Sequence, residues 1–370
     1  MKYIIFLLLF ISATSVSAQS PIDSLMQHAE SLGLHAKDYH YASNDTLAAK
    51  KAVQQFMLDL KFGNQPQLRF QGYDFALPVE AFKIRYGQLW NSAKIKELAN
   101  RLINEPNEVR QILQVLQDSV QFSADKKQLL VKAANEYRWI SAIRANRSLV
   151  LVNIPSTQLK AFESNKQVLK MRVVLGKPAR PSKTLSSKLK NLIITPYWSV
   201  PRSISIEELV PEIRKNIRYF YASHLEIFDQ HNRKVEPETV PWHRLNKNYF
   251  PYSMRQRTGK WNTLGILKIQ FDNPFKMYLH DTSEKKLFAK EKRFYSHSCI
   301  RLEKPLRLGS WLIKPASAAI DTLDAQADYS DKTPTYLTIK RDTPLIIWYS
   351  QVDFDDKGQL KIYPDIYRKN

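Results

Sequence analysis

The sequence has one cysteine, Cys299, and only nine glycines in 370 residues. No two glycines lie within five residues of each other, so the chain has neither Gly-rich phosphate loop, G-x-G-x-x-G or G-x-x-x-x-G-K-[ST]. The G-x-S-x-G nucleophile elbow is absent for the same reason. Rossmann-type dinucleotide binding, P-loop nucleotide hydrolysis and the usual α/β-hydrolase chemistry therefore have no support. A single cysteine also excludes an internal disulfide framework.

Acidic residues are also few: 35 Asp and Glu stand against 56 Lys and Arg, which gives a formal net charge of +21. The basic residues are spread along the whole chain, without a recognition helix or zinc-finger spacing, so nucleic acid is not expected as a partner. If the protein is exported, as the start of the chain indicates below, the polyanion that it would meet is the cell envelope, whose peptide stems and surface polymers carry carboxylates and phosphates. A solvated basic surface without a specific partner is the alternative.

Long apolar runs are missing except for a short one at the start of the chain. Lys2 precedes the apolar run Ile4–Ile11, and Val16-Ser17-Ala18 forms a signal-peptidase site before Gln19. This pattern predicts a cleaved signal peptide, residues 1–18, and an exported protein of the periplasm or cell envelope. No later stretch approaches the about 18 apolar residues of a membrane span, so none is expected in the mature chain. An uncleaved N-terminal anchor is the alternative.

Residues 19–145 are predicted to form a helical scaffold domain. Apolar residues from Ile22 to Leu32 recur at helical spacing and end at Gly33, a typical C-terminal stop. A second helix is predicted from an N-cap at Asn44 or Asp45 to Gly63. Apolar stripes predict three more helices, over 91–104, 106–121 and 123–142.

Residues 146–370 are predicted to form a mostly β domain, so the fold class is α+β. Alternating or continuous apolar runs bounded by turn residues indicate the strands. We expect strands at 149–154, 158–162, 168–175, 267–271, 276–280, 335–339, 345–348 and 360–362. Ser164-Asn165 and Asp356-Lys357-Gly358 are predicted hairpin turns, the second between the last two strands. A helix is predicted from Pro305, and 203–260, with one helix near 206–219, is predicted to be an insertion.

The residues with reactive side chains concentrate around the only cysteine. Cys299 lies two residues from both His297 and Arg301, and His280 ends a predicted strand nineteen residues earlier. A thiol is a useful nucleophile as its thiolate, and an imidazole or guanidinium nearby lowers the thiol pKa. These residues therefore indicate nucleophilic catalysis. Zinc bound by His280, His297 and Cys299 is the alternative, but no fourth ligand is evident, so no metal or cofactor is expected.

These residues resemble the signature of the L,D-transpeptidases with a YkuD-type catalytic domain: a His, about seventeen residues, then [Ser/Thr]-His-Gly-Cys, an apolar residue and Arg or Asn. This chain has His280 and then Ser296-His297-Ser298-Cys299-Ile300-Arg301. Further stretches are similar to the long YcbB-type branch of the family, strongly over 130–368. They are Asn153-Ile154-Pro155, Val173 to Pro178, Thr195 to Pro201, Phe250 to Gln256, Asn262 to Gly265 and Met277 to Thr282.

The resemblance implies a cysteine acyltransferase of the cell wall, with peptidoglycan stem peptides as partners and carbapenems as possible inhibitors. A tetrapeptide stem would lose its terminal D-residue through a thioester, and the acyl group would pass to an amine of another stem. The insertion 203–260 would cap the substrate. The implied roles are nucleophile for Cys299, base for His280, oxyanion or orienting roles for Tyr278, Asp281 and Ser298, and substrate binding for Arg301, His297 and Ser296.

Ser298 departs from the family pattern, because the family has Gly at that position. If the position requires a positive φ, Ser costs local strain of about 1 kcal/mol or more.

Two alternatives to transpeptidation stay open from the sequence. Water could replace the acceptor amine, which would give an L,D-carboxypeptidase, or the protein could be a catalytically weak peptidoglycan-binding protein.

Overall fold

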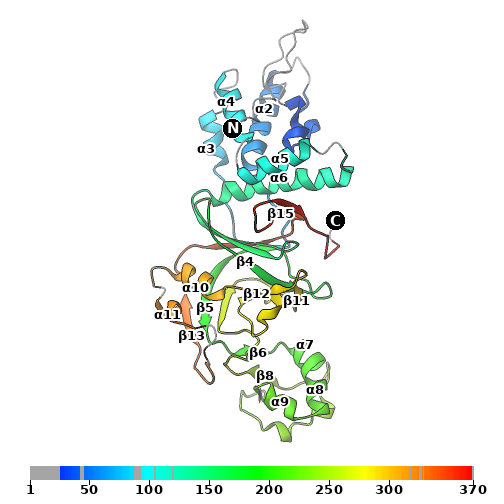
Figure 1. The fold of residues 1–370 in the computed structure, drawn as a ribbon, viewed down its shortest axis with the longest axis vertical. Coiled ribbons are helices and arrows are strands. Elements are labelled where there is room, and N and C mark those ends of the chain that lie inside the picture. Colours follow the sequence, from blue (N-terminus) through cyan, green and yellow to red (C-terminus); the bar gives the residue numbers. More distant parts are fainter. Residues whose placement is uncertain are drawn as a thin grey trace. The chain divides into compact units, whose positions relative to one another are not determined.

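The computed structural model describes residues 26–368 except 42–45, 87–92, 104–105, 119–120, 317, 325–326 and 328. The predicted signal peptide and the predicted N-cap at Asn44 or Asp45 lie outside these residues. The chain divides into two compact units, drawn in Figure 1. One contains the residues before Pro66 together with Ala76–Ala142, and the other contains Pro66–Phe75 and Ile143–Asn370.

The first unit is built from helices. They are α2 (Thr46–Phe62), α3 (Val79–Tyr86), α4 (Ala93–Ile103), α5 (Asn107–Gln117) and α6 (Ala124–Arg144). Apolar stripes of α2 and α4, including Phe56, Leu60 and Ala99, pack into one buried cluster. The predicted helix before Gly33 ends as a 3-10 turn, Ala29–Leu32, and Gly33 adopts a left-handed φ of 70°. Helix α3 was not predicted from the sequence.

The second unit contains an eleven-stranded sheet. Its main path runs β1-β5-β14-β2-β3-β4-β12-β10-β9, and β9 pairs with the second half of β5, so the strands close on themselves. Strands β11 and β13 add to β4 and β5. The bounds are β1 (Phe70–Gln71), β2 (Ser148–Asn153), β3 (Gln158–Glu163), β4 (Lys166–Gly176), β5 (Leu185–Ile194), β9 (Leu267–Phe271), β10 (Leu279–His280), β11 (Phe294–Ser296), β12 (Ile300–Leu302), β13 (Thr335–Thr338) and β14 (Pro344–Trp348).

One face of this sheet forms the main core. Alternate residues of neighbouring strands, such as Val173, Ile269 and Leu279, are buried in it. Helix α10 (Pro305–Ile313), predicted from Pro305, adds Leu308 and Leu312, and the short α11 (Ala318–Asp321) packs beside it. The remaining residues of each strand point to the opposite face, which carries the polar clusters described below.

Two predictions for strands of this unit need correction. The turn at Asp356-Lys357-Gly358 joins β15 (Val352–Phe354) to β16 (Leu360–Ile362), whereas the sequence predicts the preceding strand at 345–348. The strand predicted at 276–280 is present only as β10, because Lys276 has a left-handed φ of 55° that interrupts extended backbone. The predicted Ser164-Asn165 turn is present, with both residues at positive φ, and joins β3 to β4.

Residues 198–256 form a small substructure with a core of its own. A separate three-stranded sheet contains β6 (Trp198–Ser199), β8 (Ser253–Gln256) and β7 (Leu225–Phe228). The single helix predicted near 206–219 is wrong: Asn216 has extended backbone at φ −157° and separates two short helices. The helical elements here are α7 (Arg202–Ile204), the π-turn Ser205–Leu209, α8 (Val210–Lys215) and α9 (Arg218–Ala222).

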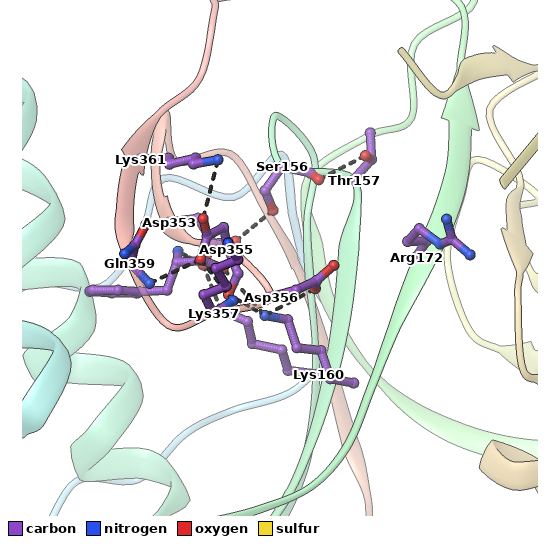
Figure 2. Close-up of polar contacts among 12 residues, drawn as sticks. Ser156, Thr157, Lys160, Arg172, Asp353, Asp355, Asp356, Lys357, Gln359 and Lys361 are labelled. Atoms are coloured by element: carbon purple, nitrogen blue, oxygen red, sulfur yellow. Dashed lines mark hydrogen bonds and ion pairs between the residues drawn. The ribbon is translucent and has the colours of Figure 1, made fainter. Parts of the chain in front are cut away.

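A buried carboxylate ties the β15–β16 hairpin to the main sheet. The Asp353 side chain accepts hydrogen bonds from Lys160 Nζ at 2.5 Å, Ser156 Oγ at 2.5 Å and Asn153 Nδ2 at 3.0 Å. Figure 2 shows Lys160 and Ser156 reaching Asp353 from the neighbouring strand and turn. Burial by itself raises the pKa of the Asp353 carboxyl, but these partners, Lys160 foremost, outweigh burial and lower it. We call this group the Asp353 cluster.

Candidate active site

The register of two parallel strands brings the predicted catalytic residues together. Strand β10 pairs with β12 so that Leu279 lies opposite Ile300 and His280 lies opposite Arg301. The Ile300 amide donates to the Tyr278 carbonyl at 3.1 Å, which extends this ladder to the Tyr278–Cys299 position. The segment between the strands therefore returns to the sheet, as the sequence analysis required for His280 to approach Cys299.

Strand alternation places these side chains on one face. Leu279 and Ile300 belong to the core, so their neighbours Tyr278, His280 and Cys299 point to the opposite face. On the other side of β10, antiparallel β9 places Lys268 opposite His280. The cluster on this face, which we call the Cys299 cluster, consists of Lys268, Tyr278, His280, Cys299 and Arg301.

The His280 imidazole is held by the next residue. Its Nδ1 lies 2.5 Å from the carbonyl oxygen of Asp281, and because that oxygen can only accept, Nδ1 carries the proton and Nε2 is free as a base. The Asp281 carboxylate accepts from the Ile266 amide at 3.1 Å and pairs with Lys285. Gly265, at φ 59°, permits this contact, because a Cβ there would lie 2.3 Å from Asp281 Oδ2.

Burial keeps this imidazole neutral. Desolvation, with the nearby Arg301 charge as second cause, lowers the pKa of His280 to about 3. The Asp281 carbonyl acts in the opposite direction but does not outweigh them. His280 is therefore an uncharged base at neutral pH.

Cys299 is the free cysteine of the chain and lies beside Tyr278. Desolvation raises the pKa of the thiol, while hydrogen bonds from Tyr278 and the charges of Lys268 and Arg301 act to lower it. The net direction differs from the lowered pKa that the sequence analysis expects from the neighbouring His and Arg. The physical reason is that burial outweighs the charges, so the resting thiol keeps its proton.

The loop that carries Cys299 is anchored to the end of β4. Ser296 pairs with Gly176, and the Ser182 hydroxyl bonds both the Gly176 amide, at 3.0 Å, and the Ser298 carbonyl, at 2.8 Å. Ser298 has a φ of 85°, in the left-handed region that favours glycine. The backbone geometry at Ser298 is therefore the one that a Gly adopts without strain.

The other predicted site residues have partners outside the Cys299 cluster. His297 Nε2 lies 2.6 Å from Oε1 of Glu208, which belongs to the inserted substructure. Arg301 is buried and pairs with Glu284. The sequence analysis missed Glu208, Glu284 and Lys268, because their contacts with the site depend on strand pairing and loop folding that the motif does not encode. Only the alternation of 267–271 could have indicated Lys268, as a polar residue on the outer face of that strand.

Among the residues that the structure describes, no group of three or more His, Cys, Asp or Glu side chains could hold a metal ion. No helix among those residues is long and apolar enough to cross a membrane.

Comparison with known proteins identifies the domain. Residues 147–323 match the family model of the L,D-transpeptidase catalytic domain, YkuD. This range contains the β10–β12 pair, the Cys299 loop and the inserted substructure. The chain thus contains an L,D-transpeptidase catalytic domain of the YkuD family, the family that the sequence motif resembles.

A curated relative agrees with this assignment. The chain is 30% identical over 284 residues to a protein of Haemophilus influenzae described as a putative L,D-transpeptidase, covering 76% of this chain. The chain spans 57% of that relative's length. Two solved structures were also compared. An L,D-transpeptidase from Mycobacterium smegmatis is 11% identical, and the match covers 54% of this chain and 58% of that chain with a TM-score of 0.23. A mutant of the Enterococcus faecium L,D-transpeptidase is 7% identical, and the match covers 85% of this chain and 88% of that chain with a TM-score of 0.29.

Proposed function

We propose that this protein is an exported peptidoglycan L,D-transpeptidase in which Cys299 is the nucleophile and His280 the base. The observation that supports this most directly is the β10–β12 register, which aligns a neutral His280 and Tyr278 with the only cysteine inside a YkuD domain. The proposed donor is a tetrapeptide stem of the cell wall, and the proposed acceptor is an amine of a second stem.

The first half of the reaction forms a thioester. His280 Nε2 takes the proton of the Cys299 thiol as the sulfur attacks the carbonyl carbon that precedes the terminal D-residue. The Tyr278 hydroxyl and the Cys299 amide stabilise the oxygen that gains negative charge. The C–N bond then breaks, and the leaving amine takes the proton from the His280 imidazolium.

The second half transfers the acyl group. The acceptor amine attacks the thioester carbonyl and gives a proton to His280, and the C–S bond breaks. The released thiolate recovers that proton from the imidazolium, which returns both groups to the neutral resting state. The inserted substructure, linked to the Cys299 loop through Glu208 and His297, is the proposed cap over the stem. Ser296 and Arg301 hold the loop on which the stem binds.

The test is product analysis with purified stem peptides. Wild-type protein mixed with a tetrapeptide donor and a stem acceptor is expected to give a cross-linked dimer and free D-residue, identified by mass. Cys299→Ser should fold normally and form no product, because a hydroxyl is far less nucleophilic than the thiolate. Tripeptide without dimer would assign the protein as an L,D-carboxypeptidase instead. Full activity in Cys299→Ser would overturn the proposal.

A carbapenem gives an independent reading of the same nucleophile. Its strained cyclic amide should acylate Cys299 and add one drug mass to intact protein. This adduct should be absent in Cys299→Ser.

A further inference from the structure

Lys268 is the one residue of the Cys299 cluster that neither the motif nor the proposed mechanism uses. It is the second residue of β9, directly opposite His280, with its side chain on the Cys299 face. Its Nζ lies 4.1 Å from the centre of the Tyr278 ring, a cation–π distance. The side chain is half-buried, so water solvates this charge only in part.

The two cations of the cluster differ in their partners. Arg301 is neutralised by its ion pair with Glu284. Lys268, in contrast, forms no ion pair with any carboxylate among the residues that the structure describes. An unpaired, half-buried ammonium is costly to a fold unless a negative charge forms beside it. Tyr278, whose ring lies against this ammonium, is hydrogen-bonded to Cys299, the group that gains negative charge in the proposed reaction.

The electrostatic environment of Cys299 supports this pairing. The titratable and charged groups on the same face are Tyr278 just before β10, His280 in β10, Arg301 in β12 and Lys268 in β9. His280 is neutral and Tyr278 keeps its proton, because burial raises its pKa. Burial raises the pKa of the Cys299 thiol and lowers that of the Lys268 ammonium, and the interaction between the two groups opposes both shifts.

We propose that Lys268 is a positioning residue of this site: its ammonium, held over the Tyr278 ring, stabilises the Cys299 thiolate and so governs how readily the nucleophile forms. The inference rests on the proposed function only in making that thiolate the nucleophile. The proton still passes to His280 Nε2, and Lys268 keeps its own protons throughout. Burial opposes ionisation of the Cys299 thiol. Without Lys268, only the Tyr278 hydrogen bonds and Arg301, whose charge is already paired, would favour the thiolate.

The experiment measures thiol ionisation directly and needs no peptidoglycan. Because Cys299 is the only cysteine, iodoacetamide reports on it alone in the full-length chain. The alkylation rate is measured between about pH 6 and pH 10 for wild type, Lys268→Met, Lys268→Gln and Lys268→Arg. In both neutral variants, the midpoint of the rate profile should move to higher pH, and the rate at pH 7 should fall at least about threefold. Lys268→Arg should keep the wild-type midpoint.

Lys190→Met is the matched control. Lys190 lies on β5, which pairs with β9, but its ammonium is exposed and pairs with Asp272. Removing this charge should leave the alkylation profile unchanged. Melting temperature and near-ultraviolet circular dichroism, measured on every variant, show that a changed profile belongs to folded protein.

The outcomes separate this inference from the proposed function. An unchanged midpoint in Lys268→Met and Lys268→Gln would overturn the inference. If KM for the stem rose at the same time, Lys268 would bind a substrate carboxylate instead. A shifted midpoint in a protein whose wild type forms no dimer would retain the Lys268–Cys299 interaction and remove the transpeptidase proposal.

Discussion

Two polar clusters on the same face of the main sheet differ in whether their buried polar groups have bonding partners. In the Asp353 cluster, the buried carboxylate has a lysine and hydrogen-bond donors at 2.5–3.0 Å. In the Cys299 cluster, a half-buried lysine has no carboxylate among the described residues, and a buried imidazole has a free Nε2. The Asp353 carboxylate thus has a cation and hydrogen-bond donors, whereas Lys268 and His280 Nε2 can still interact with a charge or a proton.

This difference indicates which cluster can do chemistry. A saturated buried ion pair holds its groups in one arrangement and in one charge state, so it contributes to the structure. Groups left without partners are costly to the fold, and they are free to bind, accept protons or stabilise a new charge. We expect substitutions in the Asp353 cluster to change stability and those in the Cys299 cluster to change the reaction.

The largest expected effect is on stability, in Lys160→Met. This change leaves Asp353 buried without its cation, and breaking a buried pair in this way costs about 3–5 kcal/mol of unfolding free energy. The measurement is urea unfolding at pH 7. Lys160 stabilises the charged form of Asp353, so the loss should be present above the unfolded carboxyl pKa and shrink as pH falls below it.

The double variant Lys160→Met, Asp353→Asn is the control for this prediction. It removes both charges, so it should recover part of the stability lost in the single variant. Equal stability of Lys160→Met and wild type would show that the Asp353 cluster is not a structural one.

Much of the catalytic domain could be predicted from the sequence. The hairpin at Ser164-Asn165, strand 267–271 and the helix from Pro305 all appear, because local turn chemistry and alternation determine them. The predicted helix near 206–219 failed at Asn216, where packing of the small inserted core overrides a helical pattern. The sequence also gave no signal for β10 beginning only after Lys276 or for β15.

For the candidate site, spacing indicated Cys299 and His280 but not their electrostatics. The closeness of His297 and Arg301 in sequence predicts a lowered thiol pKa, yet burial raises it. Burial and ion pairing depend on how neighbouring strands and the loop between them fold together: Glu284 neutralises Arg301, and β9 supplies Lys268. No local pattern contains this information.

The second prediction, smaller in free energy, tests the open side of the comparison with His280→Gln. Glutamine keeps the polar shape but is no base, so turnover should fall at least about 10²-fold, which corresponds to about 2.7 kcal/mol. His297→Gln is the matched control and should cost much less, since His297 contacts Glu208 and lies outside the Cys299 cluster. The reverse order would mean that the two roles are misassigned.

His280→Gln should also change how the stability of the fold depends on pH in acid. The pKa of His280 is about 3 in the folded protein and about 6.5 when unfolded, so between these values the unfolded chain binds a proton that the folded chain does not. Stability from this group is therefore complete above about pH 6.5 and is lost as pH falls toward 3. Melting temperatures should fall less steeply across this range in His280→Gln than in wild type.

The smallest expected effect is at Ser298, the residue before Cys299, whose backbone is strained. Ser298 has a φ of 85°, so Ser298→Gly should relieve strain and raise the unfolding free energy by about 1 kcal/mol. Ser199→Gly is the control, because Ser199 lies in extended β6 and glycine there should destabilise by about 0.5–1 kcal/mol. Urea unfolding and turnover are measured for both variants. A destabilised Ser298→Gly would refute the strain account, and lower turnover at unchanged stability would instead assign the hydroxyl a role beside the thiolate.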